Sequence, residues 1–507
     1  MPFAGPARGQ PSFAPRRWRS AALMTSAAAL VAGCAAVGPN FQPPKPPVTD
    51  SYRQNTDVVN QGPIETKVGE KVVAEWWTLF HMPQLDALMR EAIANNRTLE
   101  AARARLKAAR EAVGVDTGQT FADLSAGYKR QRANLSAAGF TPPPQFSFPT
   151  NPQFNLYSIG SVVSYNFDVF GGVRRQREAL EADAEAKARE LDAAYLTLTG
   201  QVVIQDFTIG DATVHVSALQ DIVANDQSDL NMVKKAFAAG GASAVDIATI
   251  QTQLAADQAA IPPYKAKIAI ARHQMAVLIG KTPSQWDAPD FDLKNGELPM
   301  NLPVAIPSEL VRGRPDILQA EARLHAATAR VGVATADLYP KISLNATLGQ
   351  DTLTPERFFS PLSSSYTIGP ALSLPLFHSG ELHAAKREAE ANAEAEYATY
   401  QQTVLAAFAQ VDDALQGIAF DNEAYAQLSA ALDAATAKLE MMRKGFKAGG
   451  VSGLQLVDAE RSWRRTRLNL SDLGRSRVVD AARLLLATAT APAGVAETQP
   501  EKHSTKP

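Results

Sequence analysis

Residues 97–126 read RTLEAARARLKAAREAVGVDTGQTFADLSA, and residues 315–344 read PDILQAEARLHAATARVGVATADLYPKISL. The two stretches overlay without a gap, so that Gly114 meets Gly332 at an offset of 218 residues. A period of this length is far longer than the repeat of a solenoid or a propeller. The overlay therefore predicts one large structural unit that is duplicated in tandem within a single chain.

Two shorter matches support the duplication further along the chain. The sequence YSIG at 157–160 meets YTIG at 366–369, and FAAGG at 237–241 meets FKAGG at 446–450, both at an offset of 209 residues. The copies therefore differ mainly in loop length. We predict a first repeat at 76–283, a linker at 284–303, a second repeat at 304–490 and a disordered tail at 491–507.

The N-terminus carries the only cysteine of the chain. Three arginines between residues 16 and 19 precede a short apolar run at 21–32, which is the pattern of a signal peptide and is too short to span a bilayer. The run Val31-Ala-Gly-Cys34 resembles the lipobox of bacterial lipoproteins. It predicts a signal peptide at 1–33 and covalent lipid, including palmitate, on Cys34, followed by a Pro-rich tether at 34–75. The alternative is an ordinary secretory signal with a chance cysteine.

Charge and motifs exclude several classes of function. The formal net charge of −2 offers no basic surplus for a nucleic-acid partner. No nucleophile motif, phosphate-binding loop or catalytic acid pair stands out, so we expect neither an enzyme nor a cofactor beyond the lipid. His378 and His383 lie close in sequence without a third ligand, so no metal site is expected.

Four segments alternate apolar with small or polar residues, as β-strands with two different faces do: 121–129, 157–167, 341–349 and 366–376. Their length suits tilted membrane strands, although a soluble antiparallel sheet with one buried face shows the same alternation. Four strands are too few for a barrel, and hydrocarbon tolerates no unpaired strand edge. If these strands cross a membrane, several chains must share one barrel.

Two tracts without proline, 153–261 and 376–491, are rich in strong helix formers. A helix over 173–238 would be about 100 Å long, and its apolar spacing is typical of coiled-coil hairpins. Glycine pairs at 240–241 and 449–450 mark the turns. We expect Pro262-Pro263, and more weakly Gly200 and Gly210, to kink or interrupt the helices of the first repeat.

Motifs spread along the chain resemble the outer-membrane factor family of efflux systems, the TolC-like and NodT-like lipoprotein channels. They are Trp76-Trp-Thr-Leu-Phe80, Pro83-Gln-Leu-Asp86, Leu278-Ile-Gly280, Ile306-Pro-Ser-Glu-Leu310, Arg314-Pro-Asp-Ile317 and Ala336-Asp-Leu-Tyr-Pro340. The resemblance implies a mixed α+β membrane protein. In it, a homotrimer pools four strands per chain into a twelve-stranded barrel that is continued by a helical periplasmic tunnel.

The same resemblance implies a passive exit duct in the outer membrane, lipid-anchored, with a long periplasmic extension. It would export small molecules such as drugs for a tripartite pump. Its partners would be a periplasmic adaptor (membrane fusion) protein and an inner-membrane resistance-nodulation-division transporter. Two alternatives stay open, namely a type I protein secretion duct and a lipid-anchored periplasmic coiled-coil scaffold.

The resemblance also implies a periplasmic gate near the second glycine turn. Phe446, Leu454, Asp458 and Arg461 match the family pattern, and the last three share one helical face at i, i+4 and i+7. We hypothesise that Leu454 plugs the entrance while Asp458 and Arg461 latch adjacent helices. The alternative is a solvated ion pair worth under ~1 kcal/mol. The first repeat has the equivalents Phe237, Val245, Thr249 and Thr252, and Asp246 is a candidate partner.

Overall fold

The computed structural model of the chain describes residues 36–45, 65–69, 72, 74–119, 123–134, 153–286, 289, 301–304 and 307–490. The predicted signal peptide, the predicted lipidation site Cys34 and the tail at 491–507 lie outside the described residues, as does most of the linker. The chain divides into two compact units. The first comprises Met1–Gln42, Arg110–Ala182 and Leu324–Ala395, and the second comprises Pro43–Ala109, Asp183–Arg323 and Glu396–Pro507.

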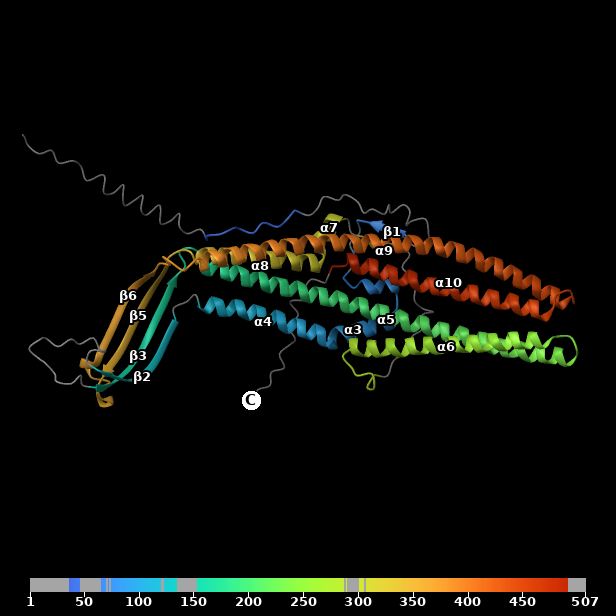
Figure 1. Ribbon diagram of the computed structural model, residues 1–507, viewed down its shortest axis with the longest axis horizontal. Coiled ribbons are helices and arrows are strands. Elements are labelled where there is room, and N and C mark those ends of the chain that lie inside the picture. Colours follow the sequence, from blue (N-terminus) through green and yellow to red (C-terminus); the bar gives the residue numbers. More distant parts are fainter. Residues whose placement is uncertain are drawn as a thin grey trace, which may run out of the picture. The chain divides into compact units, whose positions relative to one another are not determined.

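The first unit contains a four-stranded antiparallel sheet with the order β2-β3-β5-β6 (Figure 1). The strands are β2 (Asp123–Asn134), β3 (Gln153–Phe167), β5 (Lys341–Thr352) and β6 (Ser364–Ser373). The strands β2 and β5 end later than their predicted ranges and β3 begins earlier. Strand β6 ends before Pro375, which has no N–H to donate to a ladder. Two 3-10 turns, η3 (Pro355–Arg357) and η4 (Pro361–Ser363), lie between β5 and β6.

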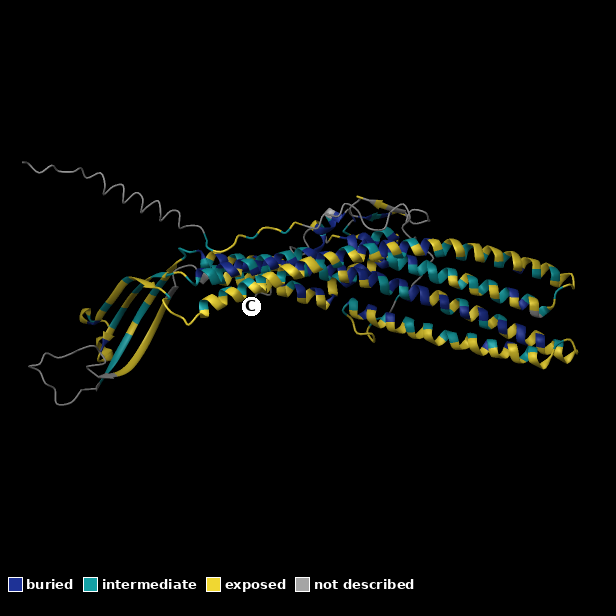
Figure 2. Cartoon of the chain, turned by 45° about the horizontal axis from the view of Figure 1, so that its top comes forward, coloured by how far each residue is buried: buried dark blue, intermediate teal, exposed yellow. Residues whose placement is uncertain are grey.

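The register of the sheet places apolar residues of different strands in common rows. Residues directly opposite each other share a face of the sheet. One such row joins Tyr165, Leu344 and Pro370, and another joins Phe167, Ile342 and Leu372. Large apolar side chains stay exposed on the described strands, among them Tyr366, which is 77% exposed. Figure 2 shows these strands in the colours of exposed and half-buried residues.

The other face of the sheet carries mainly small and polar residues, with Leu156 and Val162 of β3 among the apolar exceptions. Gly127, Gly160 and Gly349 form one row across three strands, next to Ser365 of β6. Ser365 Oγ donates to Asp351 Oδ2 at 2.7 Å, which ties β6 to β5. The sheet therefore has one mainly apolar and one mainly small and polar face, and the edges of β2 and β6 have no strand partner within the described residues.

The tether predicted at 34–75 contains ordered structure at both ends. In the first unit, the amide of Val37 donates to the carbonyl of Phe170 at 3.0 Å. The buried guanidinium of Arg175 donates to the carbonyl of Val37 and to Asn40 Oδ1. In the second unit, β1 (Glu65–Val68) pairs in parallel with β4 (Asn301–Val304). Neither of these four-residue strands was predicted from the sequence.

The helices have nearly equal lengths in the two repeats. Helices α5 (Gly172–Ala238) and α9 (Glu381–Lys447) each contain 67 residues. Helix α6 (Ala244–Leu278) contains 35 residues and α10 (Gly453–Thr488) contains 36. Helices α4 (Arg97–Gln119) and α8 (Pro315–Ala336) contain 23 and 22 residues. Each repeat thus contains a helix of 22 or 23 residues followed, after two strands, by one long helical hairpin (Figure 1). None of the described helices is long and apolar enough to cross a membrane.

Of the predicted kinks or interruptions in the first-repeat helices, the interruptions are wrong. Helix α6 continues through Pro262 and Pro263, and α5 continues through Gly200 and Gly210. The prolines remove hydrogen bonds to the carbonyls of Gln258 and Ala259, but these residues are exposed, so water can take the place of the missing donors. Gly200 instead permits close packing, because a Cβ there would lie 2.7 Å from Leu486 Cδ2.

The core of the second unit begins with the segment that precedes the first long helices. The 3-10 helix η1 (Trp76–Phe80) and α3 (Pro83–Asn95) bury Trp76, Phe80 and Leu85 completely. These side chains join a cluster to which α5, α9 and α10 contribute. A second apolar cluster packs between α5 and α6, and it is formed by Leu230, Val233, Ile250 and Leu254. Short helix α7 (Pro307–Gly313) precedes α8.

Candidate functional site

The two long hairpins turn in the same way. Gly240 and Gly449 adopt left-handed conformations, with φ of 78° and 77°, which a residue without a Cβ accepts easily. Three residues later a serine caps the returning helix, Ser243 at α6 and Ser452 at α10. Both serines form capping boxes, with Asp246 and Gln455 respectively. The duplicated sequence therefore builds two matching hairpin ends.

The structure gives Asp246 a capping role. The amide and the hydroxyl of Ser243 both donate to Asp246 Oδ2 at 2.8 Å. The amide donor lowers the pKa of the Asp246 carboxyl, and the hydroxyl donor adds to this effect. Asp246 was predicted as a possible partner of the second-repeat charges, but within one chain its recorded partner is its own helix N-terminus.

Asp458 forms an ion pair within its own hairpin. Its Oδ2 lies 3.7 Å from Nζ of Lys438, which belongs to α9. The Asp458 side chain is 74% exposed and the Lys438 side chain is 46% exposed. Water therefore screens the pair strongly, and Asp458 remains accessible to another chain.

Arg461 faces a group of acids on the first hairpin. Burial, a hydrogen bond with Asp257 and the charge of Asp257 together raise the pKa of Asp226 to about 6, against the opposite effect of the charge of Arg461. Burial also raises the pKa of Asp229, against the charges of Arg464 and Arg461. Arg461 thus acts between the hairpins of one chain, and its acidic neighbours were not predicted from the sequence.

The remaining predicted gate residues lie around the two turns. Phe237 and Phe446 are 47% and 41% exposed, and Val245 is 74% exposed. Thr249 and Thr252 are exposed, and their hydroxyls donate to carbonyls of their own helix at 2.8 Å. Leu454 lies in the first turn of α10. The structure brings none of these residues into a polar contact with Asp458 within the described chain.

One further charged contact near the turns was not predicted. Glu460 Oε1 accepts from Arg443 Nη2 at 3.0 Å, which ties α10 to α9. Glu460 Oε2 accepts from Arg464 at the same distance within α10. Glu460 lies directly before Arg461, so the concentration of charge at 458–464 is the sequence signal that could have revealed it.

Comparisons with known proteins agree with this architecture. The solved outer-membrane channel OprN superposes with a TM-score of 0.79 at 26% identity, covering 90% of this chain and 99% of that one. Nodulation protein T of Rhizobium leguminosarum bv. trifolii is 26% identical over 449 residues, which is 87% of this chain and 91% of that protein. Cation efflux system protein CusC of Escherichia coli is 25% identical over 457 residues, covering 89% and 95%.

The fold and the paired hairpins thus define the class of outer-membrane channels. The profile of the outer membrane efflux protein family matches residues 88–281 and 306–490. The chain belongs to the outer membrane efflux protein family. The resemblance inferred from the sequence is thereby confirmed. The protein is an outer-membrane transport protein, and it is not an enzyme.

Proposed function

We propose that three copies of the chain pool their strands into one closed twelve-stranded barrel and their hairpins into one periplasmic tunnel. The observation that supports this most directly is the four-stranded sheet, which combines an exposed, mainly apolar face with two edges that pair with no other strand among the described residues. A strand edge inside hydrocarbon leaves backbone groups unsatisfied, and closure with neighbouring sheets removes both edges. The small, polar face then lines the water-filled interior.

Disulfide trapping tests the closed barrel. Single cysteines introduced along β2 and along β6 are expected to crosslink between chains and to yield covalent trimers of the full-length protein in outer membranes. A control pair with one cysteine on β3 and one on β5, at the opposed positions Ser164 and Asn345, crosslinks only within a chain. Absence of any β2–β6 crosslink, together with a monomeric mass in detergent, would contradict the proposal.

The trimer acts as the passive exit duct of a tripartite efflux pump that exports small molecules. Membership of the efflux family supports this role, and one relative is named for cation efflux. The duct itself holds no energy source, so an inner-membrane resistance-nodulation-division transporter drives export, and a periplasmic adaptor protein joins the two. Deletion of the gene is expected to increase sensitivity to toxic small molecules. Loss of a secreted protein instead would indicate a type I secretion duct.

The hairpin turns of the second repeat form the gate of this duct. Leu454 narrows the entrance, and Asp458 and Arg461 hold adjacent helices together. The exposure of Asp458 and its weak pairing with Lys438 leave it available to a neighbouring chain. In planar bilayers the wild-type protein is expected to show a small, mostly closed pore. Asp458→Ala is expected to open it more often.

A matched control is Asp433→Ala, which removes an exposed aspartate from α9. Its pore should behave like that of the wild type. If both variants open equally, the latch is refuted and the duct remains. If well-folded trimers form no channel at all, the scaffold function replaces the duct.

Cys34 anchors the protein to the outer membrane through covalent lipid. Arg175 then fixes the chain shortly after the lipid, by its hydrogen bonds to Val37 and Asn40. Mass spectrometry of the mature N-terminus should show acyl chains on Cys34. Cys34→Ser should abolish them, and an unmodified mature N-terminus in the wild type would contradict the anchor.

A further inference from the structure

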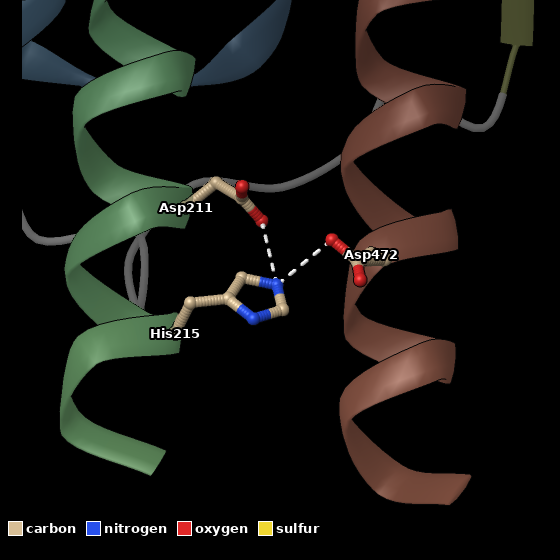
Figure 3. Close-up of side chains that lie close together, drawn as sticks. All are labelled: Asp211, His215 and Asp472. Atoms are coloured by element: carbon tan, nitrogen blue, oxygen red, sulfur yellow. Dashed lines mark ion pairs between the residues drawn. The ribbon is translucent and has the colours of Figure 1, made fainter. Parts of the chain in front are cut away.

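A buried cluster joins the two hairpins of one chain away from their turns. Asp211 and His215 lie one turn apart on α5, and Asp472 approaches them from α10 (Figure 3). His215 Nε2 lies 2.9 Å from Asp472 Oδ1 and 3.6 Å from Asp211 Oδ1. All three ligand atoms lie within 4.8 Å of one another. The gate and the barrel use none of these residues.

The imidazole nitrogen Nε2 lies at ion-pair distance from both carboxylates but lacks a hydrogen bond. His215 is only 2% exposed, yet Nε2 forms no hydrogen bond of acceptable direction within the described part of the chain. A buried polar atom without a hydrogen bond is rare in a native protein and requires an explanation. In Figure 3, Nε2 points into the space between the two carboxylates, which is where a cation would sit.

The surroundings hold the three side chains in place. The ring of His215 stacks on Tyr264 of α6 at 4.8 Å with an interplanar angle of 5°, which fixes the ring plane. Arg475 Nε lies 2.9 Å from Asp211 Oδ2, so the other oxygen of Asp211 is directed toward His215. Such outer contacts orient the ligands of metal sites in general. Arg475 also donates to Asp472 Oδ1, at the longer distance of 3.5 Å.

We propose that Asp211, His215 and Asp472 bind a divalent transition metal ion of the Zn²⁺ type. Donor atoms on a tetrahedral Zn²⁺ lie about 3.4 Å apart, a value that the two measured separations bracket. Imidazole with carboxylates suits Zn²⁺, whereas Mg²⁺ and Ca²⁺ prefer oxygen ligands alone. Asp472 is 39% exposed, so the ion can enter and water can occupy the fourth position.

The charges around the cluster favour metal ions that an imidazole coordinates over ions that are held by charge alone. Arg475 neutralises one of the two carboxylates, and Lys267 of α6 adds a weaker positive influence on Asp211. Attraction of charge alone is therefore too weak to hold a cation, and binding depends on direct coordination by His215. The ion would join α5 to α10 and so fasten the first hairpin to the second.

The test uses the full-length protein, purified without a histidine tag and stripped of metal with EDTA. Isothermal titration with ZnCl₂ is expected to show one Zn²⁺ per chain, and MgCl₂ no binding. His215→Gln should weaken Zn²⁺ binding more than about 100-fold, beyond what loss of an outer contact does. His273→Gln, which removes an exposed histidine of α6, is the matched control and should bind as the wild type does.

Asp472→Asn keeps the proposal testable if His215→Gln does not fold, because Asp472 lies at the partly exposed side of the cluster. It should also lose stoichiometric Zn²⁺ binding. In addition, Co²⁺ should give visible absorption bands in the wild type that both variants lack. Zn²⁺ binding that survives in the folded variants, or no binding by the wild type, would overturn the proposal and leave an ionic network only.

Discussion

Replacement of Arg314 by leucine should loosen the junction where the second repeat begins. Arg314 precedes α8 and is 9% exposed. Its Nη1 donates to the carbonyl of Ala487, near the end of α10, at 2.9 Å. Its other nitrogens contact both oxygens of Asp316 and the side-chain oxygen of Gln410. One guanidinium thus joins the beginning of α8 to α9 and α10.

The size of the expected destabilisation depends on which of these hydrogen-bond partners water can reach after Arg314 is replaced. Ala487 is buried, so its carbonyl loses its donor, at a cost of about 1–3 kcal/mol. The side chain of Asp316 is 39% exposed and Gln410 is exposed, so their contacts add under ~1 kcal/mol together. Arg314→Leu should therefore reduce the free energy of local opening by about 1–4 kcal/mol, which is about fivefold to 1000-fold faster amide exchange.

Hydrogen exchange followed by mass spectrometry measures this local opening in the intact protein. Peptides from the beginning of α8 and the end of α10 should exchange faster in Arg314→Leu. The matched control is Arg312→Leu, because Arg312 is exposed on α7 two residues away. That change should alter exchange by no more than about twofold. Equal exchange in the two variants would refute the assignment of Arg314 as the residue that holds the junction.

Three further predictions concern single side chains. Burial raises the pKa of Asp206 from 3.8 to about 7, so the folded chain holds a proton that the unfolded chain releases. Stability is therefore lost as the pH rises from about 4 to about 7, and Asp206→Asn should stabilise the protein at pH 8 by at most about 4 kcal/mol, with no gain at pH 4 in denaturant unfolding. Gly200→Val should destabilise by about 1–3 kcal/mol, because its side chain meets Leu486, whereas Gly114→Ala on α4 has open space and should not destabilise. Ser452→Ala should cost about 1 kcal/mol and speed exchange in the first turn of α10, while Ser462→Ala at an exposed mid-helix position should change nothing there.

Much of the fold was predictable because it is periodic and repeated. The alternation around residues 163–167 and 342–348 predicts which side chains share a face, and the register of β3 and β5 aligns these faces. The offset of 209 residues predicts that α5 and α9 are equal, and both contain 67 residues. Periodicity does not show whether a helix breaker meets water or protein, so the interruptions predicted at Pro262 and Gly200 are wrong.

Other contacts could not be read from the sequence because they depend on partners far along the chain. The strands β1 and β4 contain four residues each, too few for an alternation to be recognised, and they lie more than 200 residues apart. At the candidate gate, spacing places Asp458 and Arg461 on one face of α10. Which helix that face meets depends on how the helices of the hairpins are rotated against each other. In the structure Asp458 contacts Lys438 of α9, whereas the charge of Arg461 acts on Asp226 of α5.

The two repeats fulfil the same structural tasks with different residues. Asn96 occupies the position of Arg314, and its side chain donates to the carbonyl of Leu278, the equivalent of Ala487, while its oxygen caps α4. Asp246 and Gln455 likewise complete the same capping box. At the gate positions, however, Thr249 and Thr252 bond only to their own helix within the described chain, where the second repeat has Asp458 and Arg461. The helix caps and the contacts to the helix-end carbonyls are thus present in both repeats, whereas the gate charges are present only in the second repeat. In the proposed trimer, six similar hairpins would therefore carry gate charges on alternate hairpins, and Asp458 of one chain would face a first-repeat hairpin that offers hydroxyls in place of a second carboxylate.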